Sequence, residues 1–173
     1  PDASGKKLIP NEVVHALIQH FDEHDLSNRS VPPDILGRAY EYLIKQFADD
    51  AGAKAGEFFT PPEVVDTLVR ILEPRPGDTI YDPTAGSGGM LVHSADYLRE
   101  QGYPATSARY FAQEMNWGNA AIGKINSVLH GLEATIAAGT STITDPAFLE
   151  AGQLKKFSLV LANFPFSDEF WWL

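Results

Sequence analysis

The length, composition and charge of the chain exclude several classes of protein. Its 173 residues suffice for one domain with a full hydrophobic core, and no apolar run approaches the ~18 residues that span a membrane. A formal net charge of −10 excludes a protein that grips nucleic acid by its own basic surface, and the lack of cysteine excludes disulfides and thiolate metal sites. The composition predicts a soluble protein of a reducing compartment, the cytoplasm.

Two amphipathic helices open the chain. Residues 10–26 repeat apolar side chains at helical spacing, with Asn11 as the expected N-cap, and residues 32–50 repeat the same pattern. His20 and His24 in the first helix match the H-x-x-E-H zinc pattern. No third ligand follows them, however, so we read this segment as a solvated acidic helix end and expect no metal site.

A small, polar and glycine-bearing stretch, residues 49–57, follows these helices and predicts a linker. We therefore assign residues 1–52 to a partial N-terminal helical region and residues 53–173 to a second domain. The chain begins at Pro1 and ends in three large aromatic residues and a leucine, which predicts that it is a fragment of a longer protein.

Strands and helices alternate in the second domain. The helix over residues 60–72 has a strong start, because Thr60 suits the N-cap, Pro61 the first turn and Glu63 a capping box. The alternation predicts an α/β fold with a partial parallel sheet of about four strands and flanking helices. The expected strands are residues 79–83, 108–114, 134–139 and 157–163, and the expected helices between them are residues 90–102 and 116–131.

A glycine turn, "DPTAGSGGM", joins the first of these strands to a helix. It lacks the third glycine of a dinucleotide site, where Leu91 stands, and Asp82 would repel a pyrophosphate. The acid suits a ligand that brings a positive charge, and Glu114 at the end of the next strand can accept ribose hydroxyls. A nucleoside with an amino-acid tail, such as S-adenosylmethionine, fits this pattern. A turn that only packs helix against strand is the alternative.

The last strand ends in "ANFPF", where an amide lies between aromatic residues. Together with "GEFFTPPEVVDTLV", "YDPTAGSGGML", "FAQEMN" and "INSVLHGLE", this ending resembles the adenine-specific, S-adenosylmethionine-dependent DNA methyltransferases. The most similar members are the modification subunits of type I restriction–modification systems. The stretches keep the family's order over residues 33–167, and the resemblance implies a Rossmann-like methyltransferase core.

The resemblance implies catalytic roles for the residues after the fourth strand. The side-chain oxygen of Asn163 and the carbonyl of Phe164 would accept the hydrogens of the target amine, and Phe166 would stack on an adenine flipped out of the duplex. The family usually has proline where this chain has Phe164. The implied catalytic residues are Asn163, Phe164, Pro165 and Phe166.

The resemblance also implies a cofactor site and partners. The glycine turn would hold the methionine portion of S-adenosylmethionine, and Glu114 would hold its ribose. The partners would be DNA, a specificity subunit that supplies the DNA affinity that an acidic chain lacks, and a restriction subunit. The implied cofactor-binding residues are Phe59, Thr60, Pro61, Asp82, Pro83, Gly86, Gly88 and Glu114.

Two other functions stay open on the sequence. Asn-Pro-Pro-aromatic sites also methylate other planar amides, such as a protein glutamine, although the helices before residue 50 favour the DNA enzyme. A non-catalytic assembly subunit that keeps the cofactor fold is the second, and Phe164 in place of proline favours it.

Overall fold

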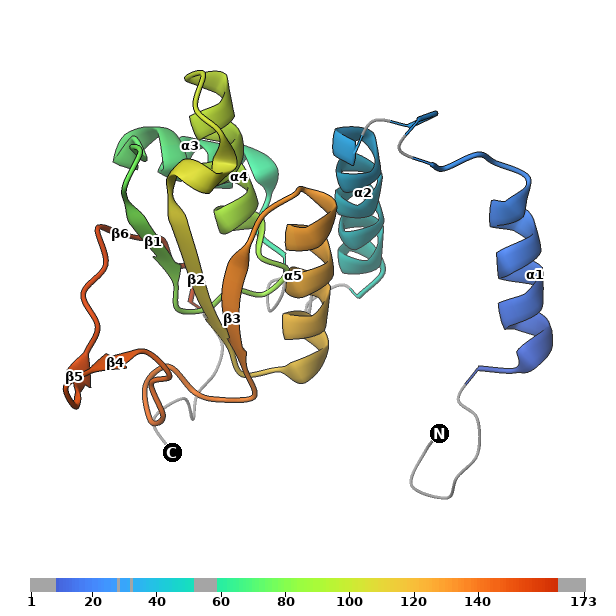
Figure 1. Ribbon diagram of the computed structural model, residues 1–173. Helices are drawn as coiled ribbons and strands as arrows, with labels where there is room; N and C mark the ends of the chain where they lie inside the picture. The colour runs from blue at the N-terminus through green and yellow to red at the C-terminus, as the bar shows by residue number, and fades with distance from the viewer. Residues whose placement is uncertain (1–8, 28, 32, 52–58, 165–173) are drawn as a thin grey trace. The chain divides into compact units, whose positions relative to one another are not determined.

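The computed structural model describes residues 9–27, 29–31, 33–51 and 59–164 of the chain (Figure 1). These residues belong to two compact units, residues 1–32 and residues 33–173. The first unit contains α1 (Asn11–Asp22), an amphipathic helix with no buried residue. Within the described residues, no helix has the length and apolar character that crossing a bilayer requires.

The second unit contains the sheet and the remaining helices. One of them, α2 (Pro33–Ala51), contacts α5 and so belongs with the sheet. The assignment of residues 1–52 to a partial N-terminal helical region and of residues 53–173 to a second domain stays a prediction. The other elements of this unit are α3 (Pro62–Leu72), β1 (Thr79–Asp82), α4 (Gly89–Glu100), η2 (Ala105–Ser107), β2 (Arg109–Glu114), α5 (Trp117–Leu129), β3 (Ala134–Ala138), β4 (Leu149–Glu150), β5 (Gln153–Leu154) and β6 (Leu159–Val160).

The main sheet has four parallel strands in the order β3-β2-β1-β6 (Figure 1). This confirms the predicted α/β class and the parallel sheet of about four strands. The chain builds the sheet outward from β1 through β2 to β3, and then returns to the other side of β1 to add β6. Strand order therefore reverses between β1 and β6, and ligands of such sheets bind at the carboxyl ends of the strands beside this reversal.

Helices α3, α4 and α5 pack on one face of the sheet. Ile80 of β1 and Ala112 of β2 point into this layer, where both are fully buried. Val69 of α3 and Leu91 and Leu98 of α4 meet them there, also fully buried. The alternation of buried and half-buried residues along β1 matches the two-residue period of a strand. This core holds the ends of β1 and β2, on which the candidate site depends.

Aromatic side chains pack on the opposite face of the sheet. Tyr81 stacks on Phe157 with their ring centroids 4.4 Å apart, and Phe111 and Phe148 complete a four-ring cluster. The ammonium of Lys155 lies 5.4 Å from the centre of the Phe111 ring. Phe148 and Phe157 flank the β4–β5 hairpin, which the sequence did not predict because each of its strands has only two residues.

Strand β6 is shorter than predicted, because only Leu159 and Val160 pair with β1. Its position is set by further contacts on both sides of this short ladder. Before it, Ser158 and Thr79 exchange two hydrogen bonds: the amide of Ser158 donates to the Thr79 hydroxyl (2.9 Å), and the amide of Thr79 donates to the Ser158 hydroxyl (3.1 Å). After it, the amide of Leu161 donates to the carbonyl of Tyr81 (3.0 Å).

Two predicted helix caps are wrong. Helix α1 begins at Asn11 itself, with Pro10 at the N-cap position and no side-chain cap. Helix α3 begins at Pro62, and its N-cap is Pro61 rather than Thr60, again with no side-chain cap. Thr60 is displaced from the cap because its hydroxyl accepts a hydrogen bond from a residue far along the chain, described below.

Candidate active site at the strand-order reversal

A pocket lies at the carboxyl ends of β1 and β6 and brings together residues that the sequence singled out separately. Five of them line it: Phe59, Thr60, Asp82, Gly86 and Asn163. Five other predicted site residues are described by the structure but do not line this pocket: Pro61, Pro83, Gly88, Glu114 and Phe164. The remaining two, Pro165 and Phe166, lie outside the described residues.

The glycine turn between β1 and α4 forms one wall of the pocket. Gly86 and Gly88 have φ angles of 51° and 77°, a left-handed conformation that favours glycine. Helix α5 approaches the turn closely, since a Cβ on Gly123 would lie 3.2 Å from the carbonyl oxygen of Gly86. Pro83 contributes its carbonyl, which accepts a hydrogen bond from Thr142 Oγ1 (2.5 Å). These contacts place the start of α4 and its free N–H groups beside the pocket.

Asp82 is a buried carboxylate without a cationic partner among the described residues. It is 2% exposed, and its Oδ1 accepts a hydrogen bond from the amide of Thr84 (3.0 Å). Burial raises the pKa of Asp82 to about 7, the Thr84 amide opposes this shift, and the nearby Glu114 carboxylate adds to it. A cation in the pocket would favour the charged form, so the site suits a positively charged ligand.

Both oxygens of Glu114 accept hydrogen bonds from the backbone. Oε2 accepts from the amide of Gly86 (2.8 Å), and Oε1 accepts from the amide of Asn116 (2.8 Å). Glu114 thus ties the end of β2 to the glycine turn. Its contact with a ribose stays a prediction, which requires one of these bonds to be shared or replaced.

Asn163 is held from two sides across the reversal. Its side-chain Nδ2 donates to Thr60 Oγ1 (3.0 Å), and its backbone carbonyl accepts from Thr84 Oγ1 (3.1 Å). Because the amide nitrogen is engaged by Thr60, Oδ1 is the free acceptor of this side chain, with no hydrogen-bond partner among the described residues. Phe164, the next residue, is 56% exposed. An oriented and unpaired amide oxygen is what holding an amine requires.

The comparison with known proteins agrees with this geometry. The family model for "N-6 DNA Methylase" matches residues 31–173, which include the sheet and the pocket. The chain belongs to the N-6 DNA methylase family.

Relatives of this chain include type I restriction enzyme methylase subunits. The chain is 31% identical over 140 residues to the HindI methylase subunit of Haemophilus influenzae, covering 80% of this chain and 30% of that protein. It is 33% identical over 172 residues to the MjaVIII methylase subunit of Methanocaldococcus jannaschii, covering 94% of this chain and 28% of that protein. The chain thus spans less than a third of the length of these relatives.

A solved structure shares the fold of this chain and confirms the predicted Rossmann-like methyltransferase core. The methyltransferase subunit of a type I restriction–modification system from Streptococcus thermophilus superposes with a TM-score of 0.73 at 31% identity. The match covers 88% of this chain and 31% of that one.

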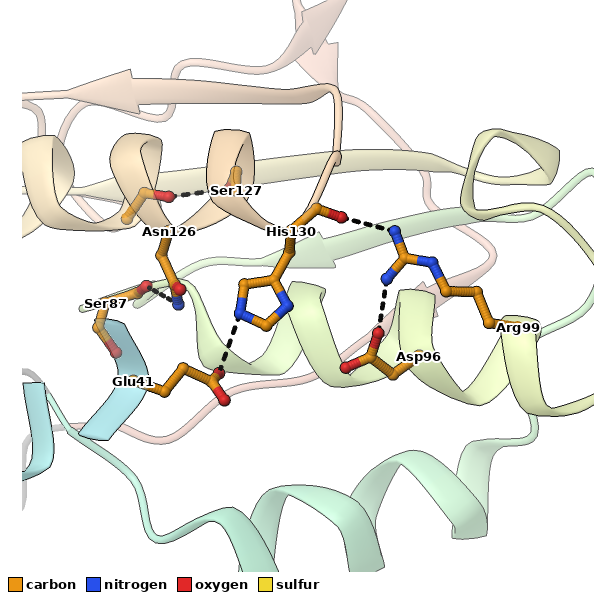
Figure 2. Close-up of polar contacts among 8 residues, drawn as sticks. Glu41, Ser87, Asp96, Arg99, Asn126, Ser127 and His130 are labelled. Atoms are coloured by element: carbon orange, nitrogen blue, oxygen red, sulfur yellow. Dashed lines mark hydrogen bonds and ion pairs between the residues drawn. The ribbon is translucent and has the colours of Figure 1, made fainter. Parts of the chain in front are cut away.

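Several residues that line the pocket were not predicted as site residues from the sequence. Glu41 of α2, Ser87 of the glycine turn, His93 of α4 and Asn126 of α5 all line it. Figure 2 shows three of them together: the amide of Asn126 extends from α5 toward Ser87, and Glu41 extends from α2 toward His130. Ser87 lies within the glycine turn that the sequence singled out, and Asn126 is a large polar residue on the buried side of α5.

Proposed function

We propose that this chain is the catalytic part of an enzyme that transfers a methyl group from S-adenosylmethionine to the 6-amino group of adenine in DNA. The observation that carries the proposal is that Asn163 and Asp82 share one pocket across the strand-order reversal, where no described residue pairs with the amide oxygen of Asn163. We further propose that the enzyme is the modification subunit of a type I restriction–modification system, as in the relatives.

The residues present fit this cofactor. Asp82 offers a buried carboxylate for a cationic ligand, and the glycine turn leaves open space, since a Cβ on Gly89 would meet no atom within 4 Å. The bound cofactor supplies a methyl group on a sulfonium, which needs no metal to make it electrophilic. Phe59, Thr60 and the turn would hold its amino-acid portion, and Glu114 its ribose.

Asn163 would act on the substrate amine. Its Oδ1 and the carbonyl of Phe164 accept the two amine hydrogens, which keeps electron density on the nitrogen that receives the methyl group. Thr60 and Thr84 act on Asn163 by holding its amide and its carbonyl in place. The flipped adenine would stack on Phe166, which lies outside the described residues.

The charge of the chain supports a companion for DNA binding. With a net charge of −10, this part of the protein lacks the basic surface that phosphate contacts need, so a specificity subunit would supply DNA affinity and sequence choice. A restriction subunit would join the same complex for cleavage. The absence of cysteine from the chain fits a reducing compartment and so supports a cytoplasmic location for this complex.

The test replaces Asn163 by alanine in the intact protein, assembled with its specificity subunit. Methyl transfer to DNA is expected to fall on the order of 100-fold or more, because the amine loses an acceptor that acts during the transfer. Binding of S-adenosylhomocysteine, measured by calorimetry, is expected to stay close to the wild-type value. Gln101→Ala, which removes an exposed amide at the far end of α4, is the matched control and should change neither quantity.

Two outcomes would contradict the proposal. Methyl transfer to a glutamine peptide but not to DNA would assign the chain to protein methylation. A wild-type complex that fails to bind S-adenosylhomocysteine would assign it to non-catalytic assembly.

A further inference from the structure

The pocket contains a buried hydrogen-bond acceptor that no described residue of the chain satisfies. Asn126 of α5 is 1% exposed, and its Oδ1 has no hydrogen-bond partner among the described residues. The great majority of buried side-chain oxygens in folded proteins are paired with protein or water. An unpaired amide oxygen that lines a ligand pocket therefore points to a donor on the ligand.

The orientation of this amide is fixed by the glycine turn. Its Nδ2 donates to the carbonyl of Ser87 (3.1 Å; Figure 2). Reversing the amide would bring its oxygen against the Ser87 carbonyl, and two acceptors repel each other. The oxygen of Asn126, rather than its nitrogen, is therefore the group left for a ligand.

A carboxylate from another helix lines the same pocket. Glu41 of α2 has a side chain that is 27% exposed, and its Oε1 lies 4.0 Å from Nε2 of the buried His130 ring (Figure 2). This separation is too long for a hydrogen bond. Lys45 and His93 also line the pocket, but neither forms an ion pair with Glu41 within the described part of the chain.

We propose that Asn126 and Glu41 form an ammonium subsite, in which both accept N–H bonds from a primary ammonium of the ligand. This inference rests on the proposed function, whose cofactor carries such a group on its amino-acid tail. A sulfonium has no hydrogen to donate to Asn126, and a carboxylate would be repelled by Glu41. An ammonium has three donors and a positive charge, and so satisfies both the unpaired oxygen and the carboxylate.

The subsite explains a role for α2 in the pocket. Glu41 lines the pocket from α2, which packs against α5. His130 fills the space beside Gly37, since a Cβ on Gly37 would lie 2.6 Å from the Nε2 atom of His130. Arg99 of α4 in turn donates to the carbonyl of His130 (2.6 Å; Figure 2). These contacts hold α2, which carries Glu41, against α5, which carries Asn126.

The experiment compares two ligands that differ only in the ammonium. Binding of S-adenosylhomocysteine and of its deaminated analogue, in which hydrogen replaces the amine, is measured by calorimetry on the intact protein. The wild type is expected to prefer S-adenosylhomocysteine. Glu41→Gln is expected to lower the affinity for S-adenosylhomocysteine about 10-fold or more, since a hydrogen bond to a charged group contributes about that factor to binding. The affinity for the analogue should stay unchanged. Glu133→Gln, with the same charge change away from this pocket, is the matched control.

A second variant covers the buried partner. Asn126→Leu removes the acceptor at similar volume, and its loss of affinity should again be confined to the ligand with the ammonium. Equal losses for both ligands in Glu41→Gln, or no loss for either, would overturn the subsite while leaving the proposed function intact. A wild type that binds S-adenosylhomocysteine and its analogue equally would also overturn it. A wild type that binds neither ligand would overturn the proposed function itself.

Discussion

Replacing Asp82 by asparagine tests whether the buried carboxylate makes the folded protein sensitive to pH. Burial raises the pKa of Asp82 from 3.8 to about 7, so between these values the folded chain holds a proton that the unfolded chain has released. Stability from this group is therefore fully present below pH 3.8 and is lost as pH rises to about 7. A difference of roughly three pKa units corresponds to a loss on the order of 4 kcal/mol.

Asparagine keeps the acceptor for the Thr84 amide but cannot ionise. Asp82→Asn is therefore expected to be more stable than the wild type at pH 8, with the advantage shrinking steadily toward pH 5. The assay is urea unfolding of the intact protein at several values between pH 5 and pH 8, and the difference between the two proteins isolates this carboxyl. A difference that stays constant over this range would refute the reasoning, because it would mean that Asp82 has the same pKa in both states.

The same shift couples ligand binding to protons. A cation placed beside Asp82 favours the carboxylate, so binding near pH 6 should release a proton and binding should tighten as pH rises through 7. Calorimetry in buffers of different ionisation enthalpy measures this release, and Asp82→Asn should abolish the part that comes from this carboxyl.

Two further substitutions follow from contacts across the domain. Thr60→Val removes the hydroxyl that orients the Asn163 amide, so the rate of methyl transfer should fall about 10-fold, more than the affinity for S-adenosylhomocysteine falls. Thr60→Ser keeps the hydroxyl and should retain activity. Equal falls in rate and affinity would show that Thr60 only shapes the cofactor pocket. Gly37→Ala places a Cβ 2.6 Å from the His130 ring. Gly37→Ala should lower the free energy of unfolding by about 1–3 kcal/mol. Adding His130→Ala to the same protein should relieve part of this loss, as measured by urea unfolding. If the losses of the two single variants simply add in the double variant, the contact does not exist.

The parts of the fold that sequence patterns predicted are those with a local cause. Strands β1, β2 and β3 alternate with amphipathic helices, and the glycine turn after β1 needs residues that adopt positive φ angles. Strand β6 was predicted too long because an apolar run shows burial but not how many residues pair with a neighbour. The β4–β5 hairpin has strands of two residues, too short to carry any period.

The parts that could not be predicted depend on contacts between distant residues. Thr60 has the local pattern of a helix cap, yet its hydroxyl binds Asn163, 103 residues away, and the tertiary contact prevails. The same holds for Asn126, whose partner Ser87 lies 39 residues earlier. Polar residues at strand ends marked where the pocket would be, but not which oxygen in it would be left unpaired.

The contacts on both sides of β6 have a consequence for the precision of the site. A ladder of two residue pairs is too short to fix its own register, and a slip by one residue would move Asn163 about 3.3 Å along the strand and turn its side chain to the other face. Two contacts of the residues just before β6 oppose such a slip: the stacking of Phe157 on Tyr81 and the two hydrogen bonds between Ser158 and Thr79. Aromatic residues on the face of the sheet away from the helices thus help to fix the position of the Asn163 amide after β6. Substitutions of these residues are expected to alter the proposed methyl transfer although they do not line the pocket.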